Sequence, residues 1–283
     1  MVNYRCSNCG DTIEPNWKLC PNCGTKIPKG KFEELKSKIY VGKQVGSNTK
    51  KKIGVIILGA LILSIVVSIM PTAGKFYNQG LSLYNQEKFD EAIDRFDKAL
   101  ELNPNHKDAK KYLSTSWHSK GIALFRQIKY SEALACFDKS IEIDPNFADS
   151  WNYKAITLSM LGRYSEALTC FEKAISINPK NSYMWNDKGY VLEKQGKFSE
   201  AISCYETAIA INPKNADSWY FKGILLFRQG NYEEAIICYD KRLAINPGDQ
   251  VTWWNKGVAF VRLGKYEQAQ ECFDKAKELG YKE

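Results

Sequence analysis

The chain has 283 residues, of which 44% are hydrophobic and 25% charged, a composition that excludes a wholly disordered or collagen-like protein and predicts at least one packed core. The net charge of +8 is concentrated near the N-terminus: residues 1–52 hold 11 Lys or Arg against four acidic residues, whereas the rest of the chain carries only +1. This nearly neutral body argues against nucleic acid as its partner. Only His106 and His118 are present, and no catalytic motif is found, so neither an enzyme nor a small-molecule substrate is predicted.

Residues 1–27 contain two pairs of cysteines with CxxC spacing, each followed by glycine. Two residues between thiolates allow a tight turn that directs both sulfurs at one ion, and two such turns supply a tetrahedral site. So short a segment cannot bury a sufficient core and needs a metal to stabilise it. The segment resembles a zinc ribbon, which predicts a structural Zn²⁺ bound by Cys6, Cys9, Cys20 and Cys23. Two disulfides or an iron–sulfur cluster are the alternatives.

A basic linker, residues 28–52, leads into a stretch without any charged residue, from Ile53 to Gly74. At about 1.5 Å per residue, a helix of this length reaches roughly 33 Å, enough for a hydrocarbon core of about 30 Å. We therefore predict a single transmembrane helix over residues 53–73. A buried core helix is the alternative, although the segment lacks the polar face that such helices usually show.

The orientation of this predicted span follows from the charges beside it. The basic residues before the span predict a cytoplasmic zinc ribbon and an extracytoplasmic repeat side. The repeat side contains five cysteines and no glycosylation sequon, and both observations argue for the opposite orientation.

From residue 73 onward the chain repeats itself, with a period of about 34 residues that is constant over the last five units. Proline after Asn or Asp ends each of the first five units, and glycine-containing turns divide several of them, so each unit is predicted to be two antiparallel helices. The predicted domain spans residues 73–283, with units 73–106, 114–147, 148–181, 182–215, 216–249 and 250–283 and residues 107–113 inserted. Seven extra residues are close to two helical turns and predict one longer helix.

Five columns of the repeat carry its pattern. They are a Trp column (Trp117, Trp151, Trp185, Trp219, Trp253), a small residue four positions later, an Ala column, an aromatic column four residues beyond that, and the prolines. This pattern resembles the tetratricopeptide repeat family. The resemblance implies an all-α, right-handed superhelical solenoid of six helix-turn-helix repeats, here preceded by the zinc ribbon and one transmembrane helix.

Two further columns recur in the repeat, and the first departs from the family pattern. Lysine stands three residues after each Trp, where many family members have an apolar residue: Lys120, Lys154, Lys188, Lys222 and Lys256. Cysteine precedes the aromatic column at Cys136, Cys170, Cys204, Cys238 and Cys272. We interpret these cysteines as small, semi-buried structural residues, because equivalent positions in neighbouring repeats lie too far apart for disulfides.

The family resemblance also implies where a partner binds. The first helices of successive units line a concave face, and the residues one, four and seven positions after each Trp point towards it. These positions become apolar and aromatic towards the C-terminus, with arginines adjacent, which suits a partner with apolar anchors and an acidic residue. Trp254 is a spare aromatic without a structural duty in this interpretation; alternatively the stripe packs between the last two units. The predicted partner-binding residues are Asn152, Ile156, Asn186, Tyr190, Tyr220, Ile224, Phe227, Arg228, Trp254, Val258 and Arg262.

Two functions from different classes remain open at this stage. The first is a membrane-anchored interaction scaffold whose repeats bind a protein or peptide segment. The second is a membrane-tethered regulator whose basic zinc ribbon contacts nucleic acid or the transcription or translation machinery. The sequence favours the scaffold.

Overall fold

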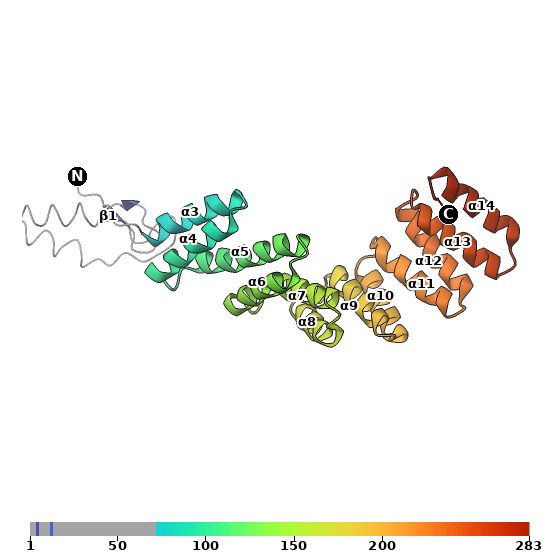
Figure 1. Ribbon diagram of the computed structural model, residues 1–283, viewed down its shortest axis with the longest axis horizontal. Coiled ribbons are helices and arrows are strands. Elements are labelled where there is room, and N and C mark those ends of the chain that lie inside the picture. Colours follow the sequence, from blue (N-terminus) through green and yellow to red (C-terminus); the bar gives the residue numbers. More distant parts are fainter. Residues whose placement is uncertain (1–3, 6–11, 14–71, 283) are drawn as a thin grey trace, which may run out of the picture. The chain divides into compact units, whose positions relative to one another are not determined.

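The structure is a computed structural model that describes residues 4–5, 12–13 and 72–282 (Figure 1). Two short strands, β1 (Tyr4–Arg5) and β2 (Thr12–Ile13), pair antiparallel, with Tyr4 opposite Ile13. The four N-terminal cysteines, the predicted linker and residues 53–71 of the predicted membrane span lie outside the described residues. Within residues 72–282, no helix is both long and apolar enough to cross a membrane.

The described part of the repeat region is all helical, with twelve helices in six pairs. They are α3 (Ala73–Asn85), α4 (Phe89–Leu102), α5 (Lys107–Arg126), α6 (Tyr130–Ile143), α7 (Ala148–Met160), α8 (Tyr164–Ile177), α9 (Ser182–Lys194), α10 (Phe198–Ile211), α11 (Ala216–Arg228), α12 (Tyr232–Ile245), α13 (Gln250–Arg262) and α14 (Tyr266–Glu278). The extra length predicted from residues 107–113 is confirmed, because α5 has 20 residues where the other first helices have 13. The chain divides into two compact units, Met1–Ser119 and Lys120–Glu283.

In the first unit, aromatic rings pack around the fully buried Phe96 of α4. Its ring centroid lies 6.0 Å from that of Tyr77 and 5.9 Å from that of Tyr112. Tyr84 completes the cluster by an edge contact with Tyr112, and its hydroxyl lies 3.2 Å from that of Ser119. Half-buried tyrosine rings thus pack around one buried phenylalanine, while alanines such as Ala92 and Ala99 fill the rest of the core.

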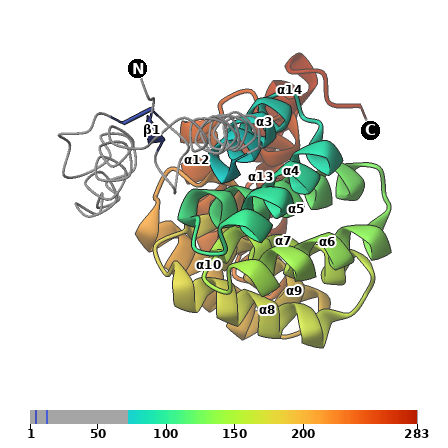
Figure 2. The same ribbon diagram turned by 90° about the vertical axis from the view of Figure 1, so that its left-hand side faces the viewer.

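In the second unit, successive helix pairs pack against one another, as α7 to α10 show in Figure 2. The aromatic column of the second helices is buried, with Phe137, Phe171, Tyr205 and Tyr239 all at 0% exposure. Each of these rings fills the notch left by the small residue of its own first helix. A Cβ added at Gly223, for example, would lie 2.7 Å from the Tyr239 ring.

The Trp column links successive units through hydrogen bonds. In the four units from Trp151 onward, the indole Nε1 donates to the carbonyl oxygen of the proline that ends the preceding unit. These bonds join Trp151 to Pro145, Trp185 to Pro179, Trp219 to Pro213 and Trp253 to Pro247, at 2.9 to 3.0 Å. The tryptophans therefore fasten each unit to the turn before it.

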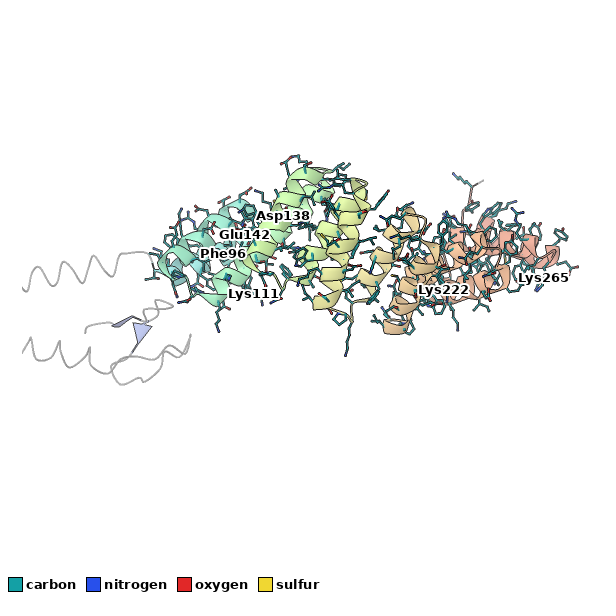
Figure 3. The ribbon with its side chains drawn as sticks, turned by 90° about the horizontal axis from the view of Figure 1, so that it is seen from below. Phe96, Lys111, Asp138, Glu142, Lys222 and Lys265 are labelled. Carbon is teal, nitrogen blue, oxygen red and sulfur yellow. The ribbon has the colours of Figure 1, made fainter. Side chains whose placement is uncertain are left out.

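The lysines that replace the family's apolar residue form a second link between units. The ammonium of Lys222 lies 2.8 Å from Glu206 of the preceding second helix, and Lys154, Lys188 and Lys256 repeat this pair with Asp138, Glu172 and Asp240. Lys222 and Asp138 are labelled in Figure 3. The four lysine side chains are only 15 to 24% exposed, so their charges are paired in partly buried surroundings.

Candidate interaction face

The predicted partner-binding residues lie on the first helices of the second unit, and helix contacts bring neighbouring ones together. Helix α9 touches α7 on one side and α11 on the other. We call the surface built by α7, α9, α11 and α13 the first-helix face. The structure separates its predicted residues into three groups: a polar group in the middle, an exposed group at the edge, and a packed group at α11 and α13.

The polar group joins α7, α9 and α11. Asn186 is only 8% exposed, and its Oδ1 accepts a hydrogen bond of 3.0 Å from the hydroxyl of Ser218. Asn152 is only 9% exposed, and its Oδ1 has no hydrogen-bond partner among the residues that the structure describes. Both amides act by hydrogen bonding to lower the pKa of Asp187, whose side chain is partly exposed. This cluster therefore places a carboxylate among buried amides.

Burial is the main influence on the Asp187 carboxyl group. It raises the pKa of Asp187 to about 6, against the two amide hydrogen bonds, which lower it, while the nearby charge of Asp217 raises it further. No Lys, Arg or His within residues 72–282 is among the groups that shift this pKa. At pH 7 the carboxyl is therefore mostly ionised, and within residues 72–282 no ion pair to it is found.

The exposed group lies at the end of α9 and α11. Tyr190 is 38% exposed, and the Lys194 ammonium lies 4.9 Å from its ring centroid. Arg228 pairs with Glu193 across the two helices, with 2.8 Å between Nη1 and Oε1. The arginine side chain is 57% exposed and the glutamate only 10%, so the guanidinium keeps a surface open to a partner.

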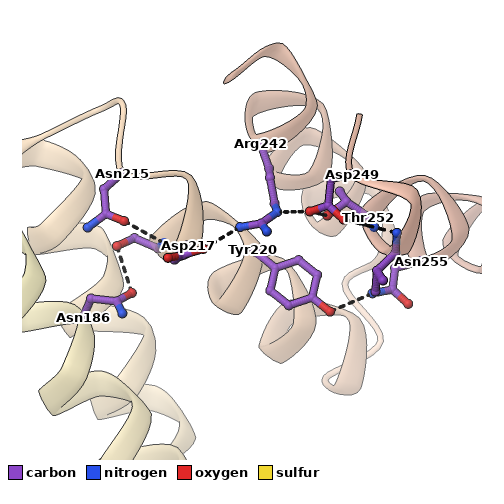
Figure 4. Close-up of polar contacts among 10 residues, drawn as sticks. Asn186, Asn215, Asp217, Tyr220, Arg242, Asp249, Thr252 and Asn255 are labelled. Atoms are coloured by element: carbon purple, nitrogen blue, oxygen red, sulfur yellow. Dashed lines mark hydrogen bonds and ion pairs between the residues drawn. The ribbon is translucent and has the colours of Figure 1, made fainter. Parts of the chain in front are cut away.

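The packed group centres on Arg242 of α12, which stands where most other units have alanine (Figure 4). Its guanidinium donates to Asp249 and, at 2.8 Å, to Asp217, and lies 4.7 Å above the ring of Tyr220. The Tyr220 hydroxyl in turn accepts a bond of 3.2 Å from the amide of Asn255. Tyr220 is thus held between the fifth and sixth repeats and is not free for a partner.

The expectation that Trp254 is a spare aromatic is wrong. Its ring stacks on Tyr281, with centroids 4.6 Å apart and an interplanar angle of 18°, and lies 4.5 Å from the ring of Phe273. Ile224 and Phe227 are likewise half-buried against the Leu226 and Tyr239 core. At this end of the face, the alternative of structural packing describes these three residues better.

The remaining predicted residues have smaller roles in the structure. Ile156 is half-buried against the Ala155 and Phe171 core, and Val258 is half-buried on α13. Arg262 is exposed at the end of α13.

The five repeat cysteines are buried free thiols, in agreement with a structural role. Burial raises the pKa of Cys238 to about 11 and raises those of Cys170, Cys204 and Cys272 as well, so these thiols are poor nucleophiles.

Three important residues of this region were not predicted from the sequence: Asp187, Arg242 and Asn255. A signal was present for two of them. Asp187 is the only acid in the column two residues after Trp, where the other units have Ser119, Tyr153, Phe221 and Asn255, and Arg242 is the only charge in a column of Ala and Ser.

Comparison with protein families gives a consistent result. Tetratricopeptide repeat models match residues 75–106 and 148–181, 114–147 and 251–279, and 186–250, and a zinc-ribbon domain model matches residues 5–27. The chain is a tetratricopeptide repeat protein with an N-terminal zinc-ribbon domain. It is a protein–protein interaction scaffold by family, and the family is generally non-enzymatic.

Solved structures with the same fold cover a large part of the chain. YrrB, described as a TPR protein with an unusual peptide-binding site, is 25% identical, with a TM-score of 0.52 over 65% of this chain and 92% of its own. MamA from Desulfovibrio magneticus RS-1 is 24% identical, with a TM-score of 0.54 over 59% and 94%. Another MamA structure is 23% identical, with a TM-score of 0.53 over 56% and 93%. No curated protein matches the chain in sequence.

Proposed function

We propose that this protein is a membrane-anchored scaffold whose first-helix face binds a peptide or protein segment. The single observation that carries the binding part is the polar and partly open surface between α7 and α11, where Tyr190 and Arg228 are exposed beside buried amides. The likeness to YrrB supports the same interpretation, since that protein is described by its peptide-binding site.

The binding face can be tested by photo-crosslinking from the full chain in its native cell. A photoreactive phenylalanine analogue replaces Tyr190 in one variant and Tyr266 in the control. Tyr266 is 70% exposed but lies on α14, a second helix. We expect a crosslinked partner from position 190 and none from position 266. Equal crosslinking from both positions, or none from position 190, contradicts the proposed face.

Anchoring by residues 53–73 is the second part of the proposal, supported by their length and lack of charge. The basic residues before the span favour a cytoplasmic ribbon, which places the repeats on the other side. Labelling of intact cells with a membrane-impermeant thiol reagent, applied to a variant with an added surface cysteine in α14, tests this orientation. If the repeats are labelled only after lysis, the predicted orientation is wrong. If alkaline carbonate extracts the protein from membranes, the predicted anchor is wrong.

The zinc-ribbon match supports a structural Zn²⁺, and the chemistry of the donor set fits it, because four thiolates in two CxxC pairs suit tetrahedral Zn²⁺. Cys6, Cys9, Cys20 and Cys23 would hold the ion. Metal analysis of the full chain should find one zinc per chain, and Cys20→Ser should lower that content. Full zinc content in Cys20→Ser contradicts this ligand set.

The zinc-ribbon match is also compatible with a second function, in which the basic N-terminal segment contacts nucleic acid. An electrophoretic shift of labelled DNA or RNA by the full chain, with affinity that falls steeply with salt, would favour it. Absence of a shift at low salt would leave the scaffold role alone.

A further inference from the structure

Large aliphatic side chains are exposed at two turns of the second compact unit. Ile128, between α5 and α6, is 73% exposed, and Met160 and Leu161, where α7 ends, are 54% and 40% exposed. Each turn joins the first helix of a pair to its second helix. Because α6 packs against α7 and successive helices run antiparallel, the two turns lie at the same edge of the array. Three large apolar side chains therefore share this edge.

The backbone at Ile128 adds to the cost of this exposure. Its φ of 65° is left-handed, and the later units have glycine at the same point, such as Gly162 and Gly196 with φ of 75° and 77°. A β-branched residue is an outlier in this conformation, and backbone strain of this kind is concentrated at functional positions. Ile128 thus gains neither a relaxed backbone nor burial from its own fold.

The fourth unit shows that the turn does not require aliphatic side chains. At the position of Met160 it has Lys194, and at the position of Leu161 it has Gln195. Helices α7 and α9 nevertheless both have 13 residues and end at equivalent residues. The exposed aliphatic residues of the third unit therefore have no part in forming the turn.

Two cations flank Ile128. Arg126 and Lys129 are exposed, and within residues 72–282 no ion pair to either side chain is found. From residue 125 to residue 131 the sequence has no acidic residue. This turn therefore presents positive charge beside an apolar tip.

The second turn adds apolar area rather than free charge. Arg163 follows it, but its guanidinium donates to both carboxylate oxygens of Glu166, at 2.7 and 2.6 Å. The cations that are open to a partner are therefore those of the first turn. We call Ile128, Met160 and Leu161, together with Arg126 and Lys129, the turn patch.

Tyrosine rings lie next to the turn patch. Tyr130 and Tyr164 begin the second helices of the two pairs, and both are half-buried. The Tyr130 ring packs on Phe125, with centroids 5.4 Å apart. Tyrosine is enriched where a bilayer meets water, because its ring is apolar and its hydroxyl is polar. The edge thus combines aliphatic tips, tyrosines and cations, which suit acyl chains, the bilayer interface and lipid phosphates.

A bilayer surface fits the turn patch better than a bound peptide does. Exposed aliphatic side chains at turn tips protrude, and they lose their contact with water only by inserting into an apolar phase. Anionic head groups would pair with Arg126 and Lys129 at the same time. The anchor proposed for residues 53–73 would keep the repeats near the bilayer, where even a small patch can bind.

We propose that the turn patch inserts Ile128, Met160 and Leu161 into the surface of an anionic bilayer, with Arg126 and Lys129 against lipid phosphates. This inference goes beyond binding at the first-helix face and rests on the proposed anchor, which supplies the proximity. Insertion would fix which edge of the array faces the membrane.

The test uses the full chain in vesicles of phosphatidylcholine, with or without phosphatidylglycerol. An environment-sensitive fluorescent amino acid is incorporated at position 161 or, as a control, at position 237. Ile237 is 55% exposed but lies on α12, and both chains share the same anchor. With phosphatidylglycerol present, a quencher attached near the head-group end of the acyl chains should quench position 161 at least about threefold more than position 237.

Two double variants separate the apolar tips from the charges. Ile128→Gly with Met160→Lys gives both positions the residues of the fourth unit, and quenching at position 161 should fall to the level at position 237 despite the added charge. Arg126→Gln with Lys129→Asn should remove the effect of phosphatidylglycerol. The matched control Ile237→Ser should leave quenching at position 161 unchanged. Circular dichroism confirms that the variants fold.

The outcomes distinguish the turn patch from the anchor. Equal quenching at positions 161 and 237 overturns the membrane site and leaves a protein as the occupant that fits, and quenching that survives both double variants overturns it too. Quenching that is the same without phosphatidylglycerol overturns the role of the cations. A chain that carbonate extracts, but whose position 161 is still quenched by added vesicles, loses the anchor and keeps the turn patch.

Discussion

Between α7 and α11 the polar side chains of the first-helix face lie around Asp187, for which no ion pair is found within residues 72–282, whereas between α11 and α13 two aspartates hold an arginine. Tyr220 occupies the repeat position of Asn186 and Asn152, whereas Arg242 lies on a second helix, α12. In the first region, Asn186 and Asn152 lie beside Asp187; in the second, Arg242 lies over the ring of Tyr220, whose hydroxyl accepts a hydrogen bond from Asn255. In the second region the charged groups are paired within the chain, and in the first the Asp187 carboxyl group lies among amides. Single substitutions in a repeat array can thus give neighbouring parts of one face different electrostatic surroundings.

The largest effect is expected at the satisfied end. Arg242→Ala leaves Asp249 without its cation, although that side chain is only 11% exposed. Burial acts to raise the pKa of Asp249, but hydrogen bonds from Thr252 and Arg242 outweigh it and hold the pKa below its usual value. Breaking such a pair should lower the free energy of unfolding by about 3–5 kcal/mol.

Urea denaturation of the full chain measures this loss. The double variant Arg242→Ala with Asp249→Asn should recover part of it, because Asn can still cap α13 and the other carboxylate that loses Arg242, Asp217, is 62% exposed. A loss below about 1 kcal/mol in the single variant would show that the pair is not important for stability.

The next effect separates packing from binding on the same face. Trp254→Ala removes the ring stacked on Tyr281 and should cost about 2–3 kcal/mol, less than for a fully buried Trp because the ring is half-buried. Tyr190→Ala should cost under about 1 kcal/mol, since that ring is 38% exposed, yet should weaken peptide binding more. Equal stability losses in the two variants would remove the distinction between the two regions.

A third effect has the opposite sign. The pKa of Asp187 rises from 3.8 to about 6 on folding, so the folded state binds more protons than the unfolded state between these values. The contribution of Asp187 to the free energy of unfolding is fully present below about pH 4 and is lost as the pH rises through 6. The loss is at most about 3 kcal/mol. Asp187→Asn should therefore be more stable than the parent at pH 7 and similar to it at pH 4.

Thermal or urea unfolding of the parent and of Asp187→Asn is measured at pH 4, 5, 6 and 7. The difference between their free energies of unfolding isolates Asp187, because the other titrating groups contribute equally to both chains. A variant less stable than the parent at pH 7 would mean that the Asp187 charge already has a stabilising partner in the chain.

The smallest effect on stability is expected outside the first-helix face, at a turn. It shows how much the free energy of unfolding changes when only the backbone conformation is strained or relieved. Ile128 has φ of 65°, a left-handed conformation that is costly for a β-branched residue, at the turn where Gly162 and Gly196 stand in later units. Ile128→Gly should raise the free energy of unfolding by about 0.5–1 kcal/mol, and Gly196→Ala should lower it by a similar amount. A destabilised Ile128→Gly would show that the 73% exposed isoleucine makes contacts worth more than the strain.

The structural roles that were predicted correctly belong to residues that have the same role in every repeat. Alanine, the aromatic ring and proline recur at the same place in successive units, and their spacing alone indicates two helices per unit and a buried ring in each. The duties of Lys222 and Trp219 were not foreseen, because their partners, Glu206 and the carbonyl of Pro213, belong to the preceding unit. Periodicity shows that a position matters without showing what it touches.

The sequence by itself determined the repeat architecture, the length of α5, the buried cysteines and the resemblance to a zinc ribbon, since each follows from local spacing along one helix or turn. Only the tertiary structure decided which polar groups are satisfied. Trp254 was expected to be spare, but its ring stacks on Tyr281, and Asp187, which was not predicted, lies near Asn152 and Asp217. The physical reason is that burial and pairing depend on side chains about one repeat away in sequence, and these distances close only when helices of neighbouring units pack.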